Sequence, residues 1–193
     1  MTLKNTRSTR RALLSIAAVL VLVVGIASPA GASKGMPEKE LPFSAVITST
    51  EFGFNMDPDA VAARCGDVAR AFSVTTTKAV GAATHLGRID LVAEHCSYLD
   101  ESGNPGPYTK GEISITAANG DVLLGTYSDG MSLTPPPLIE FVDVFTFVDG
   151  GTGRFVEASG GGVEVGVFNT VTNEIVLRME GVIVYDASNR RGD

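Results

Sequence analysis

The stretch GEISITAANGDVLLGTY, residues 111–127, decides the fold class of this chain. Up to Ala117 it alternates between apolar and polar residues, which is the period of a strand with one buried face. Asn119-Gly120 follows, and the remainder is a second apolar run. An Asn-Gly pair between two such runs is the strongest short signal of a β-hairpin, in which both turn residues take positive φ. The stretch therefore predicts two antiparallel strands and a tight turn.

Runs rich in β-branched and aromatic residues lie on both sides of this hairpin, separated by turn signals. They cover residues 43–54, 72–78, 84–98, 138–148, 163–168 and 175–185. Because most connections are short, we expect neighbouring runs to pair antiparallel. The sequence therefore predicts an all-β domain over residues 42–186. The expected form is an eight-stranded antiparallel up-and-down barrel, because closure leaves no exposed strand edge.

One short helix is expected after the first of these runs. Asp57 is a good N-cap residue, because its carboxylate can accept hydrogen bonds from free N–H groups of the first turn. Pro58 fits the first helical position, where no N–H is needed. Gly66 follows soon after and limits the length of the helix.

Residues 1–32 are typical of a secretory signal peptide. Basic side chains precede an apolar run over residues 12–26, and Ala30 and Ala32 form an Ala-x-Ala cleavage site. The run of about 15 residues is shorter than the ~20 that a transmembrane helix needs. We therefore expect a secreted protein, in the extracellular space or cell envelope, with no stable membrane association after cleavage. Arg10-Arg11 resembles a twin-arginine signal, so the general secretory and twin-arginine routes both stay open.

The segments that flank the expected barrel are polar. We expect residues 33–41 to form a flexible N-terminal arm and residues 187–193 a flexible C-terminal tail. Neither segment carries an apolar period that could be buried.

Composition places the chain among globular proteins. Its 193 residues are 44% hydrophobic and 19% charged. This is too apolar for a disordered chain. Residues 1–32 carry four basic and no acidic side chains, so their removal would take the net charge from −7 to −11. Nucleic-acid binding needs a basic surface, so we expect no nucleic-acid partner.

Cys65 and Cys96 are the only cysteines. In an oxidising, exported setting an even pair predicts a disulfide. The alternative is two free thiols, one of them a nucleophile served by a base. His95 is adjacent to Cys96, but neighbouring residues of a strand face opposite sides, so it could not readily act as that base.

The chain offers no pattern of a metal or catalytic site. His85 and His95 are its only histidines. On one strand they would lie about 33 Å apart. No serine lies in a nucleophile-elbow context, and the glycine-rich stretch at residues 150–154 lacks the spacing of a phosphate-binding loop. We expect no cofactor and no metal, and we assign no catalytic residue.

Asp143 is the candidate ligand-binding residue. It has the same parity as Phe141 and Phe145, so an inward face would place a carboxyl group among aromatic rings. Such a group would have a raised pKa and could orient a ligand or act as an acid. The opposite face of the run is also largely apolar, so an outward orientation stays open.

A glycine-rich turn carries a family resemblance. The turn consists of Gly150, Gly151, Thr152, Gly153, Arg154 and Phe155, followed by Ala158-Ser159-Gly160. It resembles the GGTGRF turn of the allene oxide cyclase-like barrel group, and plant dirigent proteins carry a similar turn. The resemblance covers about residues 41–185 and implies a calycin-like, eight-stranded barrel with a central cavity. Physically, the first three glycines allow positive φ in a tight turn, and Gly160–Gly162 permit bending or close backbone approach.

Three hypotheses for the function follow. The first is an exported barrel that binds a small apolar or aromatic ligand in its interior. The second is an enzyme of the cyclase or dirigent type, an isomerase that positions a reactive intermediate and needs no nucleophile. The third is a closed barrel with a structural or partner-interaction role.

Overall fold

The hairpin around Asn119-Gly120 is present in the computed structural model, which describes residues 39–66 and 71–186. Its strands are β4 (Pro105–Thr116) and β5 (Val122–Ser132), and they pair antiparallel. The expectation that both turn residues take positive φ was wrong. Only Gly120 does, at 85°, because the Ala117 N–H bonds to the Asp121 carbonyl and closes a longer loop.

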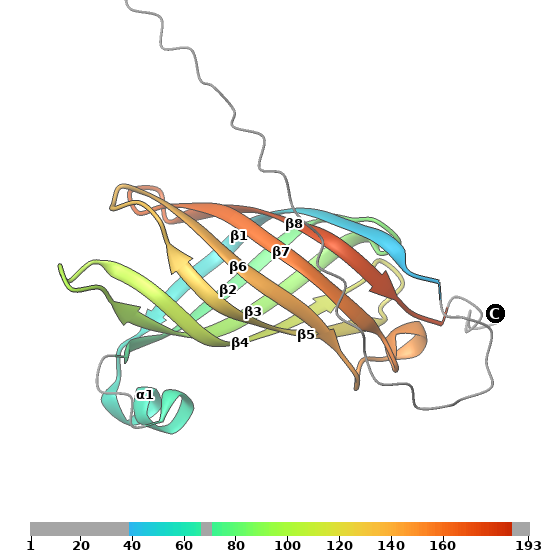
Figure 1. Ribbon diagram of the computed structural model, residues 1–193, viewed down its shortest axis with the longest axis horizontal. Helices are drawn as coiled ribbons and strands as arrows, with labels where there is room; N and C mark the ends of the chain where they lie inside the picture. Colours follow the sequence, from blue (N-terminus) through green and yellow to red (C-terminus); the bar gives the residue numbers. More distant parts are fainter. Residues whose placement is uncertain (1–38, 67–70, 187–193) are drawn as a thin grey trace, which may run out of the picture. The chain divides into compact units, whose positions relative to one another are not determined.

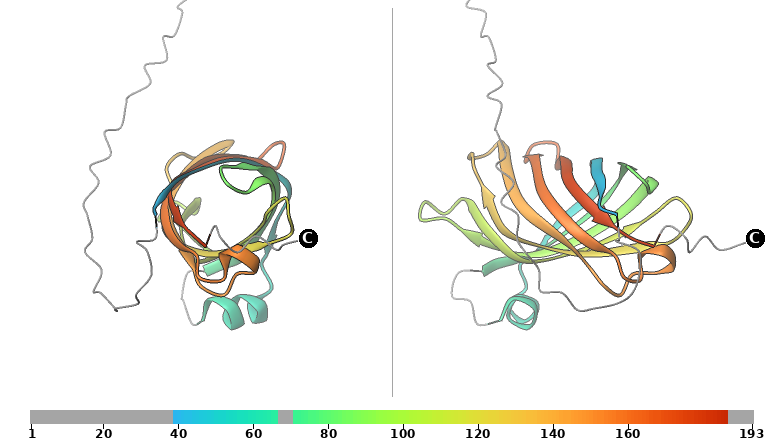
Figure 2. Two further views of the ribbon diagram at one scale, coloured as in Figure 1. Left: turned by 90° about the vertical axis from the view of Figure 1, so that its right-hand side faces the viewer. Right: turned by 45° about the vertical axis from the view of Figure 1, so that its right-hand side comes forward.

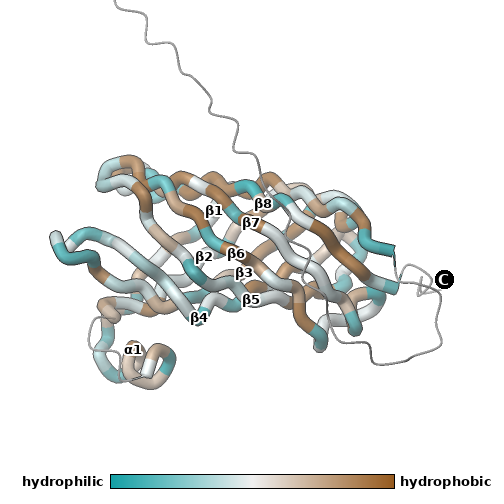
Figure 3. The backbone as a smooth tube through the Cα atoms, in the orientation of Figure 1, coloured by the Kyte–Doolittle hydropathy of each residue, from teal (hydrophilic) through white to brown (hydrophobic). Residues whose placement is uncertain are grey.

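Eight strands run in chain order around a closed antiparallel barrel, as the sequence predicts (Figure 1). The other six are β1 (Leu41–Asn55), β2 (Ala71–Ala83), β3 (Gly87–Leu99), β6 (Leu138–Val148), β7 (Ser159–Asn169) and β8 (Glu174–Val184). β1 pairs with β8 from Leu41↔Ile183 to Thr48↔Val176 and so closes the ring, which is seen end-on in Figure 2. Along the strands hydrophobic and hydrophilic residues alternate, as the barrel requires (Figure 3).

Some strand boundaries differ from those expected. β2 continues to Ala83 and β3 begins only at Gly87, because His85 and Gly87 take φ of 66° and 73° in the turn between them. β4 begins at Pro105, within the stretch DESGNPGP (100–107), whose Gly, Pro and Asn content is typical of a surface loop. β7 begins at Ser159, inside the expected glycine-rich turn. Glycines there allow strands rather than turns, since they let neighbouring backbones approach closely.

Inward-facing glycines make room for inward-facing rings on the next strand. Gly111 pairs with Tyr127, and a Cβ on the glycine would lie 2.3 Å from that ring. Gly130 and Tyr108 form the reciprocal pair on the same two strands, with a Cβ-to-ring distance of 2.0 Å. The inner wall of the barrel is therefore built from rings lying over backbone.

Helix α1 (Pro58–Cys65) lies against the outside of β2 and β3. The Asp57 side chain accepts hydrogen bonds from the N–H groups of Asp59 and Ala60, which confirms the expected N-cap. A disulfide joins Cys65 to Cys96 and confirms the expected pairing. Both sulfurs are buried in a small apolar cluster with Val61 and Val74, outside the barrel lumen.

The glycine-rich turn lies at the end of the barrel where β6 is followed by β7. Gly150 and Gly153 take positive φ, of 99° and 56°, as expected. Gly151 does not, which corrects the expectation, and it is glycine because a Cβ would lie 2.5 Å from the Val122 carbonyl oxygen. Phe155 is fully buried and packs against Tyr185, so this turn caps one end of the lumen.

Arg154 and Thr152 attach this turn to its neighbours. The Thr152 hydroxyl accepts from the Val122 N–H at 2.8 Å, and the Arg154 guanidinium donates to the His85 carbonyl at 2.6 Å. The guanidinium also lies 4.8 Å from the centre of the Phe155 ring. The turn therefore has a structural role in holding three loops together.

The expected signal peptide (residues 1–32), residues 33–38 of the expected arm and the expected tail (187–193) lie outside the described residues. Leu41, which was expected to end the arm, is the first residue of β1. Among the described residues, no helix has the length and apolar character to cross a membrane.

Candidate ligand-binding site

The lumen is filled at one end and hollow at the other. Near the glycine-rich turn, the rings of Phe43, Phe145 and Phe147 pack edge-to-face or tilted, with centroid distances of 4.9–5.9 Å. Toward the opposite end the lumen holds a cavity of about 90 Å³, lined largely by apolar side chains. This is smaller than the roughly 300–1,000 Å³ of pockets for drug-sized ligands. The cavity therefore suits a compact molecule.

Four phenylalanines surround the outer part of this cavity. Phe52 and Phe54 come from the end of β1, Phe72 from β2 and Phe168 from β7. The Phe52 and Phe168 rings are 4.4 Å apart, and Phe54 is 39% exposed. We call these four residues the mouth aromatics. They give the entrance an apolar rim.

Asp143 points into the cavity from β6, so the open question about its orientation is resolved. It is 2% exposed and lies on the inner face between Phe141 and Phe145. The Tyr108 hydroxyl donates to its Oδ2 atom at 2.7 Å. Its other oxygen, Oδ1, is buried and has no hydrogen-bond partner among the described residues.

Glu164 is a second inward-facing carboxyl group that the sequence analysis missed. It lies on β7 directly opposite Asp143 and is 8% exposed. In the sequence, the alternating valines at 163, 165 and 167 suggest an inner face, but in the structure they are exposed. The available signal was Gly166, which has the parity of Glu164 and pairs with the inward-facing ring of Phe141.

These two carboxyl groups hold protons unusually well. Burial away from water raises the pKa of Asp143 from 3.8 to about 7, although the hydrogen bond from Tyr108 acts in the opposite direction. Burial, and then repulsion from Asp143, raises the pKa of Glu164 well above its ordinary value. Two carboxylates side by side in an apolar lumen cannot both ionise freely, so the pair keeps at least one proton near neutral pH.

His95 and Tyr127 form the adjoining part of the cavity wall. The Tyr127 hydroxyl and the Nδ1 atom of His95 are 2.6 Å apart in a hydrogen bond. Burial, and then the positive charge of Arg64, lowers the pKa of His95 to about 4. The imidazole is therefore neutral near pH 7 and supplies hydrogen bonds rather than positive charge.

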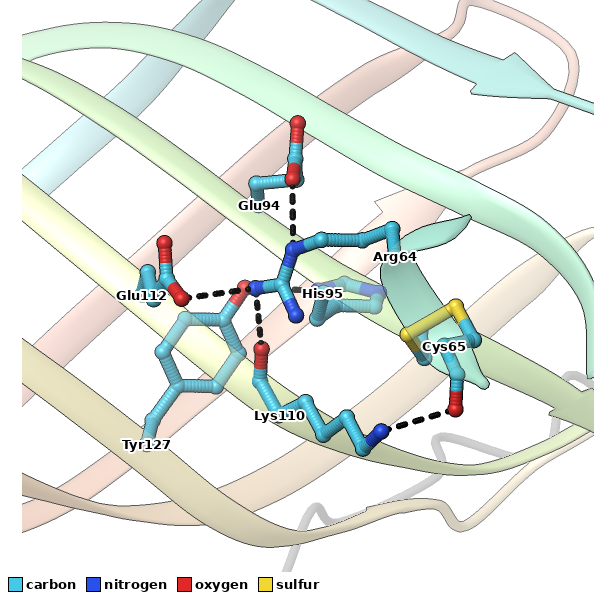
Figure 4. A network of polar contacts seen from close by, with 8 residues as sticks. Arg64, Cys65, Glu94, His95, Lys110, Glu112 and Tyr127 are labelled. Atoms are coloured by element: carbon cyan, nitrogen blue, oxygen red, sulfur yellow. Dashed lines mark hydrogen bonds and ion pairs between the residues drawn. A yellow bond between two sulfur atoms is a disulfide. The ribbon is translucent and has the colours of Figure 1, made fainter. Parts of the chain in front are cut away.

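Arg64 lies on the outside of the barrel wall behind these residues (Figure 4). Its guanidinium forms ion pairs with Glu94 at 2.8 Å and Glu112 at 3.2 Å, and it donates to the Lys110 carbonyl at 2.6 Å. The Lys110 ammonium in turn donates to the Cys65 carbonyl at 2.7 Å. Together with the disulfide, these contacts fix α1 against β3 and β4.

Thr75 and Ser97 line the wall formed by β2 and β3, and Ser73 lies behind them in the same hydroxyl cluster. The Thr75 and Ser97 oxygens are 2.6 Å apart, and the Ser73 and Thr75 oxygens are 3.1 Å apart. All three residues are buried. In an eight-stranded ring, these strands lie across the lumen from β6 and β7, so hydroxyls and carboxyls occupy opposite walls.

The remaining residues singled out from the sequence lie apart from the cavity. His85 is in the turn before β3, where its ring nitrogen Nε2 bonds to the Pro42 carbonyl oxygen at 3.0 Å. In the described part of the chain, no three His, Cys, Asp or Glu side chains are grouped to hold a metal ion.

Comparison with models of known families, with characterised proteins and with solved structures finds no match to this chain.

Proposed function

We propose that this protein is an exported barrel that binds a small molecule in its lumen. One observation carries the proposal: a largely apolar cavity is also lined by a few polar groups. They are the hydrogen-bonded Tyr108 and Asp143, the carboxyl of Glu164, and the hydroxyls of Thr75 and Ser97. Ligand sites typically combine an apolar lining with a few polar groups that fix orientation. A barrel that only needed a core would bury neither Asp143 nor Glu164, because burying a carboxyl group costs stability.

Export is supported by two features. The disulfide between Cys65 and Cys96 is typical of oxidising compartments. The sequence of residues 1–32 is typical of a secretory signal. Membership of the allene oxide cyclase-like or dirigent-like group is likewise a proposal, supported by the glycine-rich turn and by the closed eight-stranded barrel.

The test is native mass spectrometry of protein purified from the medium of its own cells. We expect a mass shift from a retained small molecule, which is lost in Ala93→Leu because the added side chain fills the lumen. Val92→Leu, one residue away on the outer face, is the matched control and should keep the bound molecule. Repeated absence of a retained molecule, together with no uptake of toluene followed by NMR, would favour a closed structural or partner-interaction barrel instead.

A second candidate function is an isomerase or cyclase that moves a proton. The Tyr108–Asp143 hydrogen bond favours it, because a carboxyl group with a pKa near the working pH is a suited acid or base. Conversion of the retained molecule into an isomer of the same mass, with loss of conversion in Asp143→Asn, would distinguish this function from simple binding.

A further inference from the structure

The described lining of the lumen has two acidic side chains and no cationic one to match them. Asp143 and Glu164 are paired residues of the neighbouring strands β6 and β7, so they lie side by side, and both line the cavity. No lysine or arginine among the described residues lines it. The guanidinium of Arg64, which acts on His95 and Tyr127, is on the outer side of the wall and is already paired with Glu94 and Glu112.

The hydrogen bonds of the two carboxyl groups are incomplete. Tyr108 supplies one donor to Asp143, and Oδ1 of this almost fully buried residue has no partner. Glu164 accepts no hydrogen bond from the described residues, although it too is more than nine-tenths buried. Buried polar atoms are nearly always paired, so Oδ1 of Asp143 is positioned for a donor that comes from a ligand, with Glu164 beside it on the next strand.

The other groups that face the pair are uncharged. They are the hydroxyls of Tyr108 on β4 and Tyr127 on β5, and the imidazole of His95 on β3. Burial raises the pKa of both phenols and lowers that of the imidazole, so none of them changes charge near neutral pH. The negative charge of Asp143 and Glu164 is therefore reduced only by the proton that the two carboxyl groups keep.

Aromatic rings surround the same space. Phe141 and Tyr108 lie beside Asp143, with ring centroids 6.4 Å apart, and the mouth aromatics follow toward the entrance. The faces of such rings attract cations, most strongly where water is excluded.

We propose that the ligand of this lumen is an organic monocation, a protonated amine on a compact apolar body, whose ammonium group binds between Asp143 and Glu164. The proposal rests on the proposed binding function and adds the class of ligand. One ammonium ion enters and one proton leaves to solvent, so the charge of the lumen is unchanged. The ammonium group brings three N–H donors to oxygens that lack them.

The test compares three probes of nearly equal size: benzylamine, benzyl alcohol and phenylacetate. Calorimetric titrations at pH 7 in phosphate and in Tris measure affinity and proton release together, because the two buffers differ in ionisation enthalpy. We expect benzylamine to bind at least about tenfold more tightly than benzyl alcohol and to release up to one proton. Phenylacetate should bind weakest, since its charge repels the pair.

The double variant Asp143→Asn/Glu164→Gln keeps the shape of the lumen and removes the acids. It should bind benzyl alcohol as before and lose both the preference for the amine and the proton release. Glu140→Gln, on the outer face of β6, is the control and should behave as wild type. Equal or tighter binding of benzyl alcohol, or a preference that survives the double variant, would overturn the proposal while leaving lumen binding intact. If none of the three probes binds, the proposal is also wrong, and the retained-molecule experiment decides separately about the binding function.

Discussion

Replacing Asp143 with Asn should make the protein more stable, and by an amount that depends on pH. The folded chain raises the pKa of this carboxyl from 3.8 to about 7. Between these values the unfolded chain has released the proton and the folded chain still holds it, so unfolding becomes easier as the pH rises. At about 1.4 kcal/mol per pH unit, the accumulated loss in the wild type is about 4 kcal/mol by pH 7.

The Asn side chain has nearly the same shape, still accepts the hydrogen bond from Tyr108, and never ionises. We therefore expect wild type and Asp143→Asn to have similar free energies of unfolding at pH 4, and the variant to be about 4 kcal/mol more stable at pH 7. Removal of the repulsion on Glu164 acts in the same direction. Urea unfolding at constant ionic strength, from pH 4 to pH 7.5, measures the difference directly.

The quantity to follow is the difference in free energy of unfolding between Asp143→Asn and wild type at each pH. Groups that titrate alike in both proteins cancel in this difference. Glu140→Gln removes an exposed carboxyl from the same strand, so its difference from wild type should stay constant with pH. If the Asp143→Asn difference is equally constant, Asp143 is not protonated in the folded protein at pH 6, and the reasoning about the carboxyl pair fails.

Three further outcomes are expected. Replacing Cys65 and Cys96 with Ser should lower the free energy of unfolding by about 3–4 kcal/mol, because the disulfide closes a loop in the unfolded chain; a wild type whose urea midpoint is unchanged by reductant would contradict this. Gly111→Ala should lower the free energy of unfolding by about 1–3 kcal/mol, because the new Cβ meets the Tyr127 ring. Gly53→Ala, where a Cβ has nothing within 4 Å, should lower it far less. Equal losses in urea unfolding would argue against the ring–glycine pairing. The pKa of His95 is lowered to about 4, so the free energy of unfolding should fall as the pH drops below 6.5, because the unfolded chain takes up the proton first. In His95→Gln this loss of stability should be smaller. An unchanged pH profile of urea unfolding in that variant would count against a buried neutral imidazole.

The alternation of apolar residues was sufficient to predict the strands and the closed barrel. The run around residue 113 shows it clearly, and its Ile113 and Ile115 side chains are buried. The runs around residues 139 and 175 bury Ile139 and Ile175 but expose Leu138 and Val176 on the opposite face. The N-cap of the helix and the disulfide also follow from local chemistry, since Asp57 and the two cysteines need only their neighbours or each other.

The composition of the candidate site could be predicted only in part, because two strand irregularities reverse the parity. Tyr108 and Ile113 differ in parity, yet both face the lumen, because the pairing of β4 shifts where Lys110 takes a φ of 55°. Asp129, also at 55°, does the same on β5. Such bulges re-aim side chains near binding sites and carry no simple sequence signal. Tyr108 as the partner of Asp143 was therefore beyond the reach of parity alone.

The seam between β1 and β8 sets the order in which this chain can finish folding. Every other pair of neighbouring strands follows directly in the chain, whereas the seam joins Leu41 to Ile183. Until β8 is available, β1 and β7 each present a row of unpaired backbone groups, which is a template for other chains. A chain interrupted before residue 174 would therefore keep two adhesive edges, and we expect it to aggregate rather than to form a smaller barrel.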